Sequence, residues 1–270
     1  MTSSAFLLRA AGATEITAAG YTVLDWPTRP KNRSSTVVSD LAWSLAPLPA
    51  IRARVADLVH VAAGAYMADR NTARGVRFSR DLALRVAVLD PDAWNDQVLD
   101  AVADLLGWLT GDVWDVTITP APAVRLPDHW PNKELDGPIS LMSGGLDSFM
   151  GALHLLQSGR LPSLTAHKDS ATAVRHAQRR TWLWLARTFS PPPSYTRVAL
   201  TQAGGRIEAS SRSRALMFMS LGVAVAIARG ARTLVMPENG YTSINLPLRP
   251  NRGGALSTRS THPETMHRFT

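Results

Sequence analysis

The sequence of 270 residues contains no cysteine, only three lysines and no long apolar run. Without cysteine the chain can form no disulfide framework, no thiolate nucleophile and no Cys-ligated zinc site. The longest apolar run, residues 215–228, is shorter than the roughly 18–20 residues that a membrane-spanning helix needs. The apolar patch at residues 5–8 follows no basic segment, unlike a signal peptide. These absences predict a soluble, cytoplasmic protein without a membrane partner.

Acidic residues are scarce in the second half of the chain. Residues 1–137 hold 13 basic and 16 acidic side chains, whereas residues 138–270 hold 16 basic and 5 acidic ones. The net charge of +8 therefore comes from the second half. Nearly all basic residues are arginines, which bind phosphate and carboxylate through two parallel hydrogen bonds. The pattern favours an anionic ligand, although a genomic bias toward arginine codons would produce the same arginine excess.

Prolines divide the chain at the point where its charge changes. Proline interrupts helices and central strands, so a proline cluster is typical of a linker. We therefore expect an N-terminal mixed α/β domain at 1–120, a Pro-rich linker at 121–137 and a second domain at 138–270. The apolar fraction of 45% suits a folded chain with a sizeable core. The prolines are Pro120, Pro122, Pro127, Pro131 and Pro138.

The N-terminal region mixes the two hydrophobic periods. Apolar residues at helical spacing predict helices at 49–70 and 91–109, and short apolar or alternating runs predict strands at 6–9, 21–26, 82–89 and 113–119. Four aspartates recur every fourth residue in the second of these helices: Asp92, Asp96, Asp100 and Asp104. Such a stripe is typical of a solvated helix face. The alternative is a docking surface for a basic partner or for the basic second half of this chain.

The second half alternates strands with helices. Strands are predicted at 138–142, 162–166, 195–200 and 233–237, and helices at 147–157, 171–188 and 212–229. This alternation predicts an α/β fold, with a parallel sheet and helices on both of its faces. Ligands of such sheets bind beyond the carboxyl ends of the strands. That rule directs attention to residues 143–148, 167–169, 201–205 and 238–241.

Residues 143–148 read Ser-Gly-Gly-Leu-Asp-Ser, directly after an apolar strand and at the start of a helix. Gly144 and Gly145 let the backbone approach an anion closely, and the helix N-terminus adds partial positive charge. The hydroxyls of Ser143 and Ser148 can donate to phosphate oxygens. Asp147 would repel phosphate but suits a Mg²⁺ ion that bridges phosphates. The plain alternative is a helix N-cap with a tight turn.

This hexapeptide resembles the SGGxDS loop of the PP-loop ATP pyrophosphatases. The resemblance implies an adenine nucleotide alpha hydrolase-like fold, with ATP and Mg²⁺ bound at the loop. It also implies cleavage of ATP between the α and β phosphates, an adenylated carbonyl or carboxylate, and displacement of AMP by a nitrogen or sulfur nucleophile. The rival phosphate-binding pattern GxxxxGK[ST] does not occur in the sequence.

Further segments resemble one branch of that superfamily. Ser213-Arg214 before a long apolar helix is similar to the arginine-bearing turn of 7-cyano-7-deazaguanine synthases. Residues 109–114, 237–241, 245–248 and 256–263 look like the QueC-like proteins of Qat anti-phage systems. The resemblance implies a small anionic, deazapurine-like substrate, a 7-deazapurine carboxylate, that becomes an amide, a nitrile or a conjugate. It also implies a protein partner from a defence operon.

The resemblance assigns roles to particular residues. Asp147, Ser148 and Arg214 would be catalytic, and Asp147 would hold Mg²⁺. Loop residues Ser143, Gly144, Gly145 and Leu146, together with Asp147, Ser148 and His167, would bind ATP, and Glu238, Asn239, Arg259 and His262 would contact the second substrate. For His167 a solvated loop, and for Glu238 and Asn239 simple turn chemistry, are the alternatives.

Two departures from the family's pattern bear on the substrate pocket. The synthases carry a four-cysteine zinc site, which this chain lacks. The chain also stops at Thr270, soon after His262-Pro263, where the resemblance implies further sequence. We therefore expect a C-terminal truncation, either as a fragment or as a loss of that part.

Two other functions remain open at this point. The basic second half suits a PP-loop enzyme that modifies tRNA or another nucleic acid, although no stretch interleaves aromatic and basic residues. Nucleic acid is therefore the less favoured partner. The loop could instead serve a non-catalytic nucleotide-binding component of a defence complex.

Overall fold

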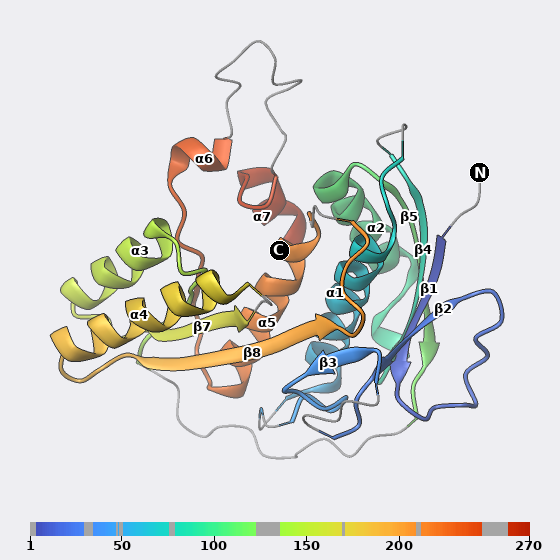
Figure 1. The fold of residues 1–270 in the computed structure, drawn as a ribbon, viewed down its shortest axis with the longest axis horizontal. Helices are drawn as coiled ribbons and strands as arrows, with labels where there is room; N and C mark the ends of the chain where they lie inside the picture. Colours follow the sequence, from blue (N-terminus) through green and yellow to red (C-terminus); the bar gives the residue numbers. More distant parts are fainter. Residues whose placement is uncertain are drawn as a thin grey trace, which may run out of the picture.

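The computed structural model describes residues 4–29, 35–46, 48, 51–75, 79–122, 136–168, 171–208, 212–244 and 259–270. In this part of the chain the fold is α/β, with two sheets (Figure 1). The first sheet is wholly parallel, in the order β2 (Thr22–Trp26), β1 (Ser4–Ala10), β4 (Asp81–Val88), β5 (Val113–Pro120).

The second sheet combines parallel strands with one antiparallel edge strand. Its order is β3 (Val37–Ser39), β8 (Ser194–Gln202), β7 (Ser163–Lys168), β6 (Ile139–Leu141), β9 (Leu234–Val235). β3 runs antiparallel to β8, and the other pairs are parallel. The chain moves outward from β6 through β7 to β8 and then returns to the other side of β6 as β9. The strand order thus reverses between β6 and β9, which is where open α/β sheets bind ligands.

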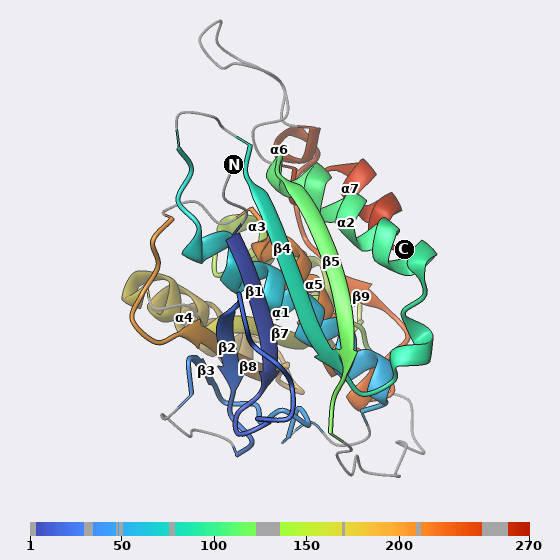
Figure 2. The same ribbon diagram turned by 90° about the vertical axis from the view of Figure 1, so that its right-hand side faces the viewer.

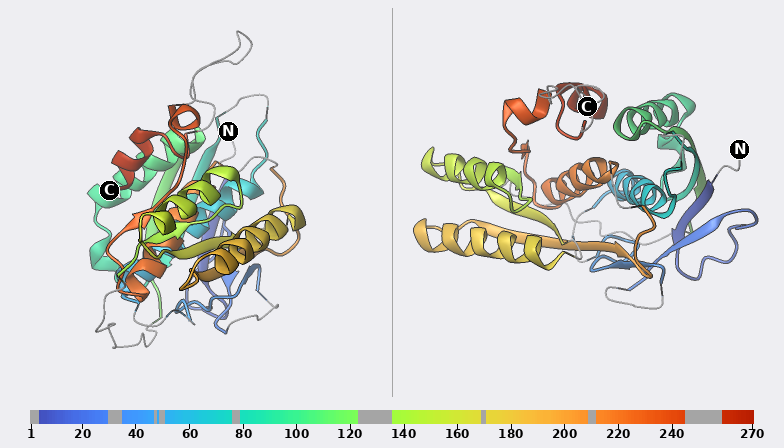
Figure 3. Two further views of the ribbon diagram at one scale, coloured as in Figure 1. Left: turned by 90° about the vertical axis from the view of Figure 1, so that its left-hand side faces the viewer. Right: turned by 45° about the horizontal axis from the view of Figure 1, so that its top comes forward.

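Right-handed crossovers decide which face each helix covers. The helices α3 (Leu146–Gln157) and α4 (Thr172–Thr188) lie on one face of the second sheet, and α5 (Arg214–Ala228), which makes the return crossover, lies on the other (Figure 3). α5 packs against α1 (Ala53–Asn71), and α1 packs against the first sheet. These two helices therefore form a layer between the two sheets. The remaining helices are α2 (Asp96–Thr110), α6 (Gly240–Ile244) and α7 (Pro263–Phe269), with a short 3₁₀ turn at Pro91–Ala93.

The helix α1 is buried on most of its circumference, from Ala56 to Arg70. Its small residues permit this: a Cβ at Gly64 would lie 3.2 Å from Leu84 Cδ1 and 3.5 Å from Leu8 Cβ. Polar side chains of α1 are buried as well. His60 stacks on Trp43 with ring centroids 3.7 Å apart, and Asp57 accepts hydrogen bonds from the N–H groups of Leu89 and Asp90.

One hydrophobic core joins the two halves of the chain. It contains Leu8, Trp26 and Val86 from the first half together with Leu200 and Leu221 from the second. β3, from the first half, pairs with β8 of the second. The expected segments 1–120 and 138–270 thus share a core and a sheet. Most of the expected linker, residues 123–135, lies outside the described residues.

The outer face of the first sheet is turned away from the helices (Figure 2). In β4 the residues alternate between buried and partly exposed up to Val86. This alternation is usual for antiparallel sheets and uncommon for parallel ones, which are commonly covered on both faces. Helices on both faces, as expected for the second half, are found there and not on the first sheet among the described residues. None of the helices among the described residues combines the length and the apolar character that a membrane span requires.

The aspartate stripe on α2 divides into two kinds of residue. Asp92 lies in the preceding 3₁₀ turn rather than on α2, because the predicted helix 91–109 is interrupted before Asp96. Asp96 and Asp100 are exposed, as a solvated face requires. Asp104 instead pairs with Arg268 of α7, which packs on α2. This contact is of the kind that the alternative interpretation expects, in which the second half of the chain docks on the stripe.

Candidate functional site

A cavity of about 530 Å³ lies where β6 and β9 end, at the reversal of the strand order. This volume is within the range of small-molecule sites. Its walls come from both halves of the chain: α2, the 143–148 loop, the start of α5, the segment after β9 and the segment before α7. The lining residues are Leu109, Leu141, Ser143, Ser148, Val174, Arg212, Arg214, Ala215, Phe218, Met236, Pro237, Glu238, Arg259, Ser260 and Thr261.

Ser148 organises the 143–148 loop from inside. Its side chain is 3% exposed, and its Oγ donates a hydrogen bond to the carbonyl of Gly145 at 2.9 Å. The same Oγ accepts from the N–H of Gly144 and from Ser143 Oγ, both at 3.2 Å. The loop is therefore held in shape by its own hydrogen bonds. The N–H groups of Leu146, Asp147 and Ser148 lie in the first turn of α3. N–H groups in the first turn have no carbonyl partner within their own helix.

Gly144 is required by both conformation and packing. Its φ is +90°, a region that side chains other than glycine rarely adopt. A Cβ there would lie 2.9 Å from Gln178 Cγ and 3.1 Å from Gln178 N. Gly145 differs, because its φ is −86° and the nearest atom to a Cβ would be Ser143 Oγ at 3.6 Å. Gly144 thus permits the backbone conformation of the loop, and the absence of a side chain at Gly145 leaves space beside the backbone there.

Gln178 of α4 fixes the loop from the opposite side. Its side chain is 1% exposed. Nε2 donates to the carbonyl of His167 at 3.1 Å and to those of Met142 and Ser143 at 3.4 Å. Although α4 is rich in polar residues, Gln178 is therefore not part of its solvated face. The residue instead connects the carboxyl ends of β6 and β7 to α4.

Asp147 and Asn239 meet beside the loop. Asn239 Nδ2 lies 3.2 Å from each carboxylate oxygen of Asp147. No group of three or more acidic or histidine side chains that could hold a metal occurs among the described residues. Mg²⁺ needs no such group, because it is commonly held by one or two carboxylates, substrate phosphates and water. A carboxylate beside a helix N-terminus fits that ligand set.

The start of α5 brings Arg212 and Arg214 to the cavity wall. Asp69 of α1 determines where this segment lies: its Oδ2 accepts from the N–H groups of Arg212 at 3.0 Å and Ser213 at 3.1 Å. Burial lowers the pKa of Arg212, and the nearby charges of Arg74 and Arg259 lower it further, against the opposite effect of Asp112 and Asp69. Positive charge is therefore concentrated on this wall.

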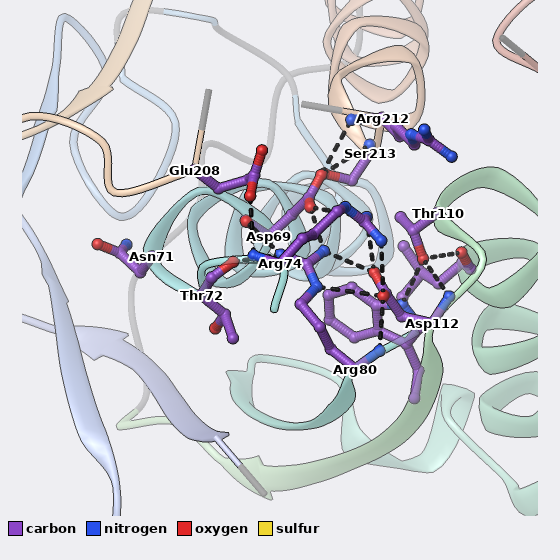
Figure 4. Close-up of polar contacts among 12 residues, drawn as sticks. Asp69, Asn71, Thr72, Arg74, Arg80, Thr110, Asp112, Glu208, Arg212 and Ser213 are labelled. Carbon is purple, nitrogen blue, oxygen red and sulfur yellow. Dashed lines mark hydrogen bonds and ion pairs between the residues drawn. The ribbon is translucent and has the colours of Figure 1, made fainter. Parts of the chain in front are cut away.

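Beneath that wall lies a buried ion-pair network (Figure 4). Asp112 accepts two hydrogen bonds from Arg74, both at 2.9 Å, and pairs with Arg80 at 2.5 Å. Arg80 also pairs with Asp69 at 2.5 Å. Burial lowers the pKa of Arg80, but the hydrogen bonds to Asp112 and Asp69 outweigh it and raise the pKa above its usual value. The network holds β4, α1 and the α2–β5 turn against the start of α5.

Arg259 reaches the cavity from the segment before α7. Its guanidinium lies 4.3 Å from the centre of the Trp108 ring, and Nη1 donates to the Trp108 carbonyl at 2.7 Å. His262, expected beside Arg259 in a substrate loop, does not line the cavity. Its Nδ1 accepts from the N–H of Glu264 and caps α7, and its ring packs on Trp108 at 5.6 Å. His262 therefore caps α7, and its expected contact with a substrate stays a prediction.

His167 is a core residue. Its side chain is 1% exposed, Nε2 lies 2.9 Å from the Leu200 carbonyl, and the ring meets Tyr66 edge to face. Both sequence interpretations of His167, as an ATP contact and as part of a solvated loop, are wrong because β7 continues to Lys168 and carries this side chain into the core. Among the other expected residues, Ser143, Ser148, Arg214, Glu238 and Arg259 share the cavity, and Asp147 and Asn239 pair beside it.

Sequence reasoning missed three contributors: Arg212, Gln178 and Asp69. Arg212 stands two positions before Arg214, and the run Arg-Ser-Arg could have suggested a cationic turn. Gln178 and Asp69 have no signal in the sequence, because their roles depend on contacts across 36 and 144 positions of the chain. Comparison with known protein families, with curated proteins and with solved structures finds no significant match.

Proposed function

We propose that this protein is an ATP-dependent adenylating enzyme of the 7-cyano-7-deazaguanine synthase-like type that acts in anti-phage defence. It activates a carboxylate, a 7-deazapurine acid, as an acyl-adenylate. One observation carries the proposal: a single cavity at the strand-order reversal is lined by the Ser-Gly-Gly-Leu-Asp-Ser loop, by Arg214 and by Glu238.

The loop supports the triphosphate end of ATP. The N–H groups in the first turn of α3 would bind phosphate oxygens, and the partial positive charge of the helix favours them. The hydroxyl of Ser143, which donates to Ser148 Oγ within the loop, would have to turn toward the phosphate to donate to it. Mg²⁺, held by Asp147 and phosphate oxygens, would neutralise charge on the departing pyrophosphate. Ser148 keeps the loop in shape and is a positioning residue here, because its hydroxyl is occupied within the loop.

The proposed reaction has two steps. A carboxylate oxygen of the acid attacks the α phosphorus of ATP, the bond to the β-phosphate oxygen breaks, and pyrophosphate leaves. A nitrogen nucleophile then attacks the acyl carbon and AMP leaves with the electron pair of the acyl–oxygen bond. Arg214 stabilises the negative charge that develops on the phosphate oxygens. Orientation and charge neutralisation supply the catalysis, and no side chain needs to form a covalent bond.

Pyrophosphate release tests the proposal directly. The full chain is mixed with ATP, Mg²⁺, ammonia and 7-carboxy-7-deazaguanine, and pyrophosphate is measured with and without the acid. We expect acid-dependent release that Asp147→Ala abolishes and that Asp100→Ala, a change on the exposed face of α2, leaves unchanged. Binding of ATP without any release would instead indicate a non-catalytic nucleotide-binding component. Failure to bind ATP would refute the proposal.

One surface feature favours the nucleic-acid alternative. Trp184 of α4 is 48% exposed, and Arg180 and Arg187 lie one turn to either side of it in a shallow depression with Phe149. An exposed aromatic ring between arginines can stack on a base. A steep salt dependence of RNA binding that Trp184→Ala reduces would support this alternative. Arg160→Ala, outside this depression, is the control.

A further inference from the structure

A groove of about 650 Å³ lies between α1, α2 and α5, and the end of α7 contributes to its wall. It shares no described lining residue with the cavity at the strand-order reversal. Val61 of α1, Leu105 of α2 and Leu216 of α5 form a buried floor, each at most 4% exposed. Val98 and Ala101 of α2 line the groove and are exposed to solvent. The protein therefore leaves an apolar surface between three helices open.

The helix α7 shows how a helix is held beside this groove. It packs on α2 and lies along it (Figure 2). Trp108 Nε1 donates to Thr265 Oγ1 at 2.9 Å, whereas the later Arg268 pairs with the earlier Asp104, so the two helices run antiparallel. Phe269 lines the groove and packs on the core. An apolar side chain in the groove and a neighbouring basic side chain on an aspartate thus hold α7 in place.

The groove extends along α2 beyond the contact with α7. Gln97 and Val98 line it about two turns before Asp104. Between Gln97 and Leu105 the axis of α2 rises about 12 Å, which is room for about two turns of a further helix. An amphipathic helix binds an apolar groove of this kind through residues spaced i, i+4 and i+7. The length and the apolar lining of the groove therefore suit the apolar face of a helix.

The aspartates of α2 decide which helices fit best. Asp100 lies one turn before Asp104, is exposed, and forms no ion pair with any described residue. Asp92 and Asp96, further toward the start of α2, are exposed as well. Residues 91–110 contain no lysine, arginine or histidine that would neutralise this charge. Complementary charge attracts a basic partner to this end of α2 and repels an acidic one.

We propose that this groove is a docking site for a basic amphipathic helix of a partner protein. Apolar residues of that helix enter the groove between Leu58 of α1 and Val98 of α2, and arginine or lysine residues beside them pair with Asp100. The partner helix thus repeats, one turn further along α2, the way in which Phe269 and Arg268 hold α7. The site lies apart from the cavity of the proposed adenylation and does not depend on that reaction.

The test measures the binding of labelled peptides of about 18 residues to the full chain by fluorescence anisotropy, a length at which an isolated helix can form. The basic probe has leucine at positions i, i+4 and i+7 and arginine directly before each leucine, on a background of alanine and glutamine. Glutamate replaces arginine in the acidic probe, and the scrambled probe distributes the same residues around the helix. We expect the basic probe to bind saturably, and the other two to bind at least about tenfold more weakly.

Variants of the chain locate the binding. Ala101→Gln adds an uncharged polar side chain to the groove at an exposed position, so the fold should be kept and the basic probe should bind about tenfold more weakly. Asp100→Arg should weaken the basic probe about fivefold and strengthen the acidic probe. Asp115→Arg makes the same charge change at an exposed position of β5 and is the matched control, expected to change either affinity less than about twofold.

Four outcomes would overturn the proposal. The first is no saturation by the basic probe up to about 1 mM. Equal weakening by Asp100→Arg and Asp115→Arg would show that net charge alone attracts the probe. Unchanged binding to Ala101→Gln would place the peptide outside the groove. If sedimentation shows that the chain forms dimers and that Ala101→Gln dissociates them, a second copy of the chain fills the groove in place of a partner.

Discussion

Asp69 accepts two hydrogen bonds from Ser213, from the backbone N–H at 3.1 Å and from Oγ at 2.8 Å. The two residues are 144 positions apart, and both are fully buried. A carboxylate at the N-terminus of α5 interacts favourably with the helix dipole. A residue of the first half therefore fixes the position from which Arg212 and Arg214 reach the cavity.

Replacing Asp69 should lower the free energy of unfolding. Asp69→Asn keeps the shape but removes the charge that Arg80 pairs with, and breaking a buried ion pair costs about 3–5 kcal/mol. Urea denaturation measures the loss of unfolding free energy. Asp104→Asn is the control, because the side chain of Asp104 is 67% exposed and its pair with Arg268 should contribute less than about 1 kcal/mol. Similar losses for both variants would show that the network contributes no more than a surface pair.

The two loop glycines should respond differently to alanine. Gly144→Ala places a Cβ in the left-handed region, at about 1–2 kcal/mol, and against Gln178, so a clear loss of stability is expected. Gly145→Ala should change the unfolding free energy by less than about 0.5 kcal/mol, because its φ is ordinary and space is available. Gly145→Ala should nevertheless weaken ATP binding if phosphate approaches the backbone there. Unchanged ATP affinity in Gly145→Ala, measured by calorimetry, would contradict that approach.

Removing the amide of Gln178 should loosen the loop. Gln178→Met has a similar length but no donor, so the buried carbonyl oxygens of Met142 and His167 lose their contacts with the amide, at about 1–3 kcal/mol. Arg179→Met, at an exposed neighbouring position, should be nearly neutral. Hydrogen exchange of the 143–148 loop should accelerate in Gln178→Met alone. Equal rates of hydrogen exchange of the loop in both variants would show that Gln178 does not hold the loop in place.

Tyr195 should ionise at a higher pH than an ordinary tyrosine. Burial raises the pKa of its phenol above the usual 10.0, against a smaller opposite effect of Arg197, and the ring stacks on Trp182. Because the unfolded chain releases this proton first, stability is unaffected below about pH 10 and falls as the pH rises above it. Absorbance at 295 nm follows the ionisation. Tyr195→Phe should reduce the loss of stability at alkaline pH. An equal loss in the variant would show that other groups cause it.

Local patterns predicted most of the elements. The strands of the second half and the helices α3 and α4 begin and end within a few residues of their expected bounds, because their apolar periods are regular and Gly or Pro residues flank them. β3 was not predicted, since three residues carry no period and their pairing depends on β8. α7 was not predicted either, because its seven residues are stabilised by Trp108, Asp104 and the His262 cap.

The part of the site that directly follows a predicted strand could be predicted from the sequence. Residues 143–148 follow a strand directly, so their place at the sheet edge follows from the βαβ pattern. The position of His167 was predicted wrongly because the ends of strands are uncertain by a few residues. The strand was expected to end at residue 166, but β7 continues through His167, and the side chain of His167 is buried. Arg259 reaches the cavity through Trp108, a contact between residues 151 positions apart that no local pattern contains.

The pairing of β3 with β8 has a practical consequence for dividing the gene. A piece ending near residue 122 would carry β3 without its partner strand and would expose α1, whose surface is covered by α5 in the intact chain. A piece starting near residue 136 would lack the Asp69 carboxylate that holds the start of α5. Neither piece should fold well alone, yet the two made together should recognise each other through α1, α5 and the strand pair. The chain is therefore suited to a split reporter, in which signal appears only when both pieces are present.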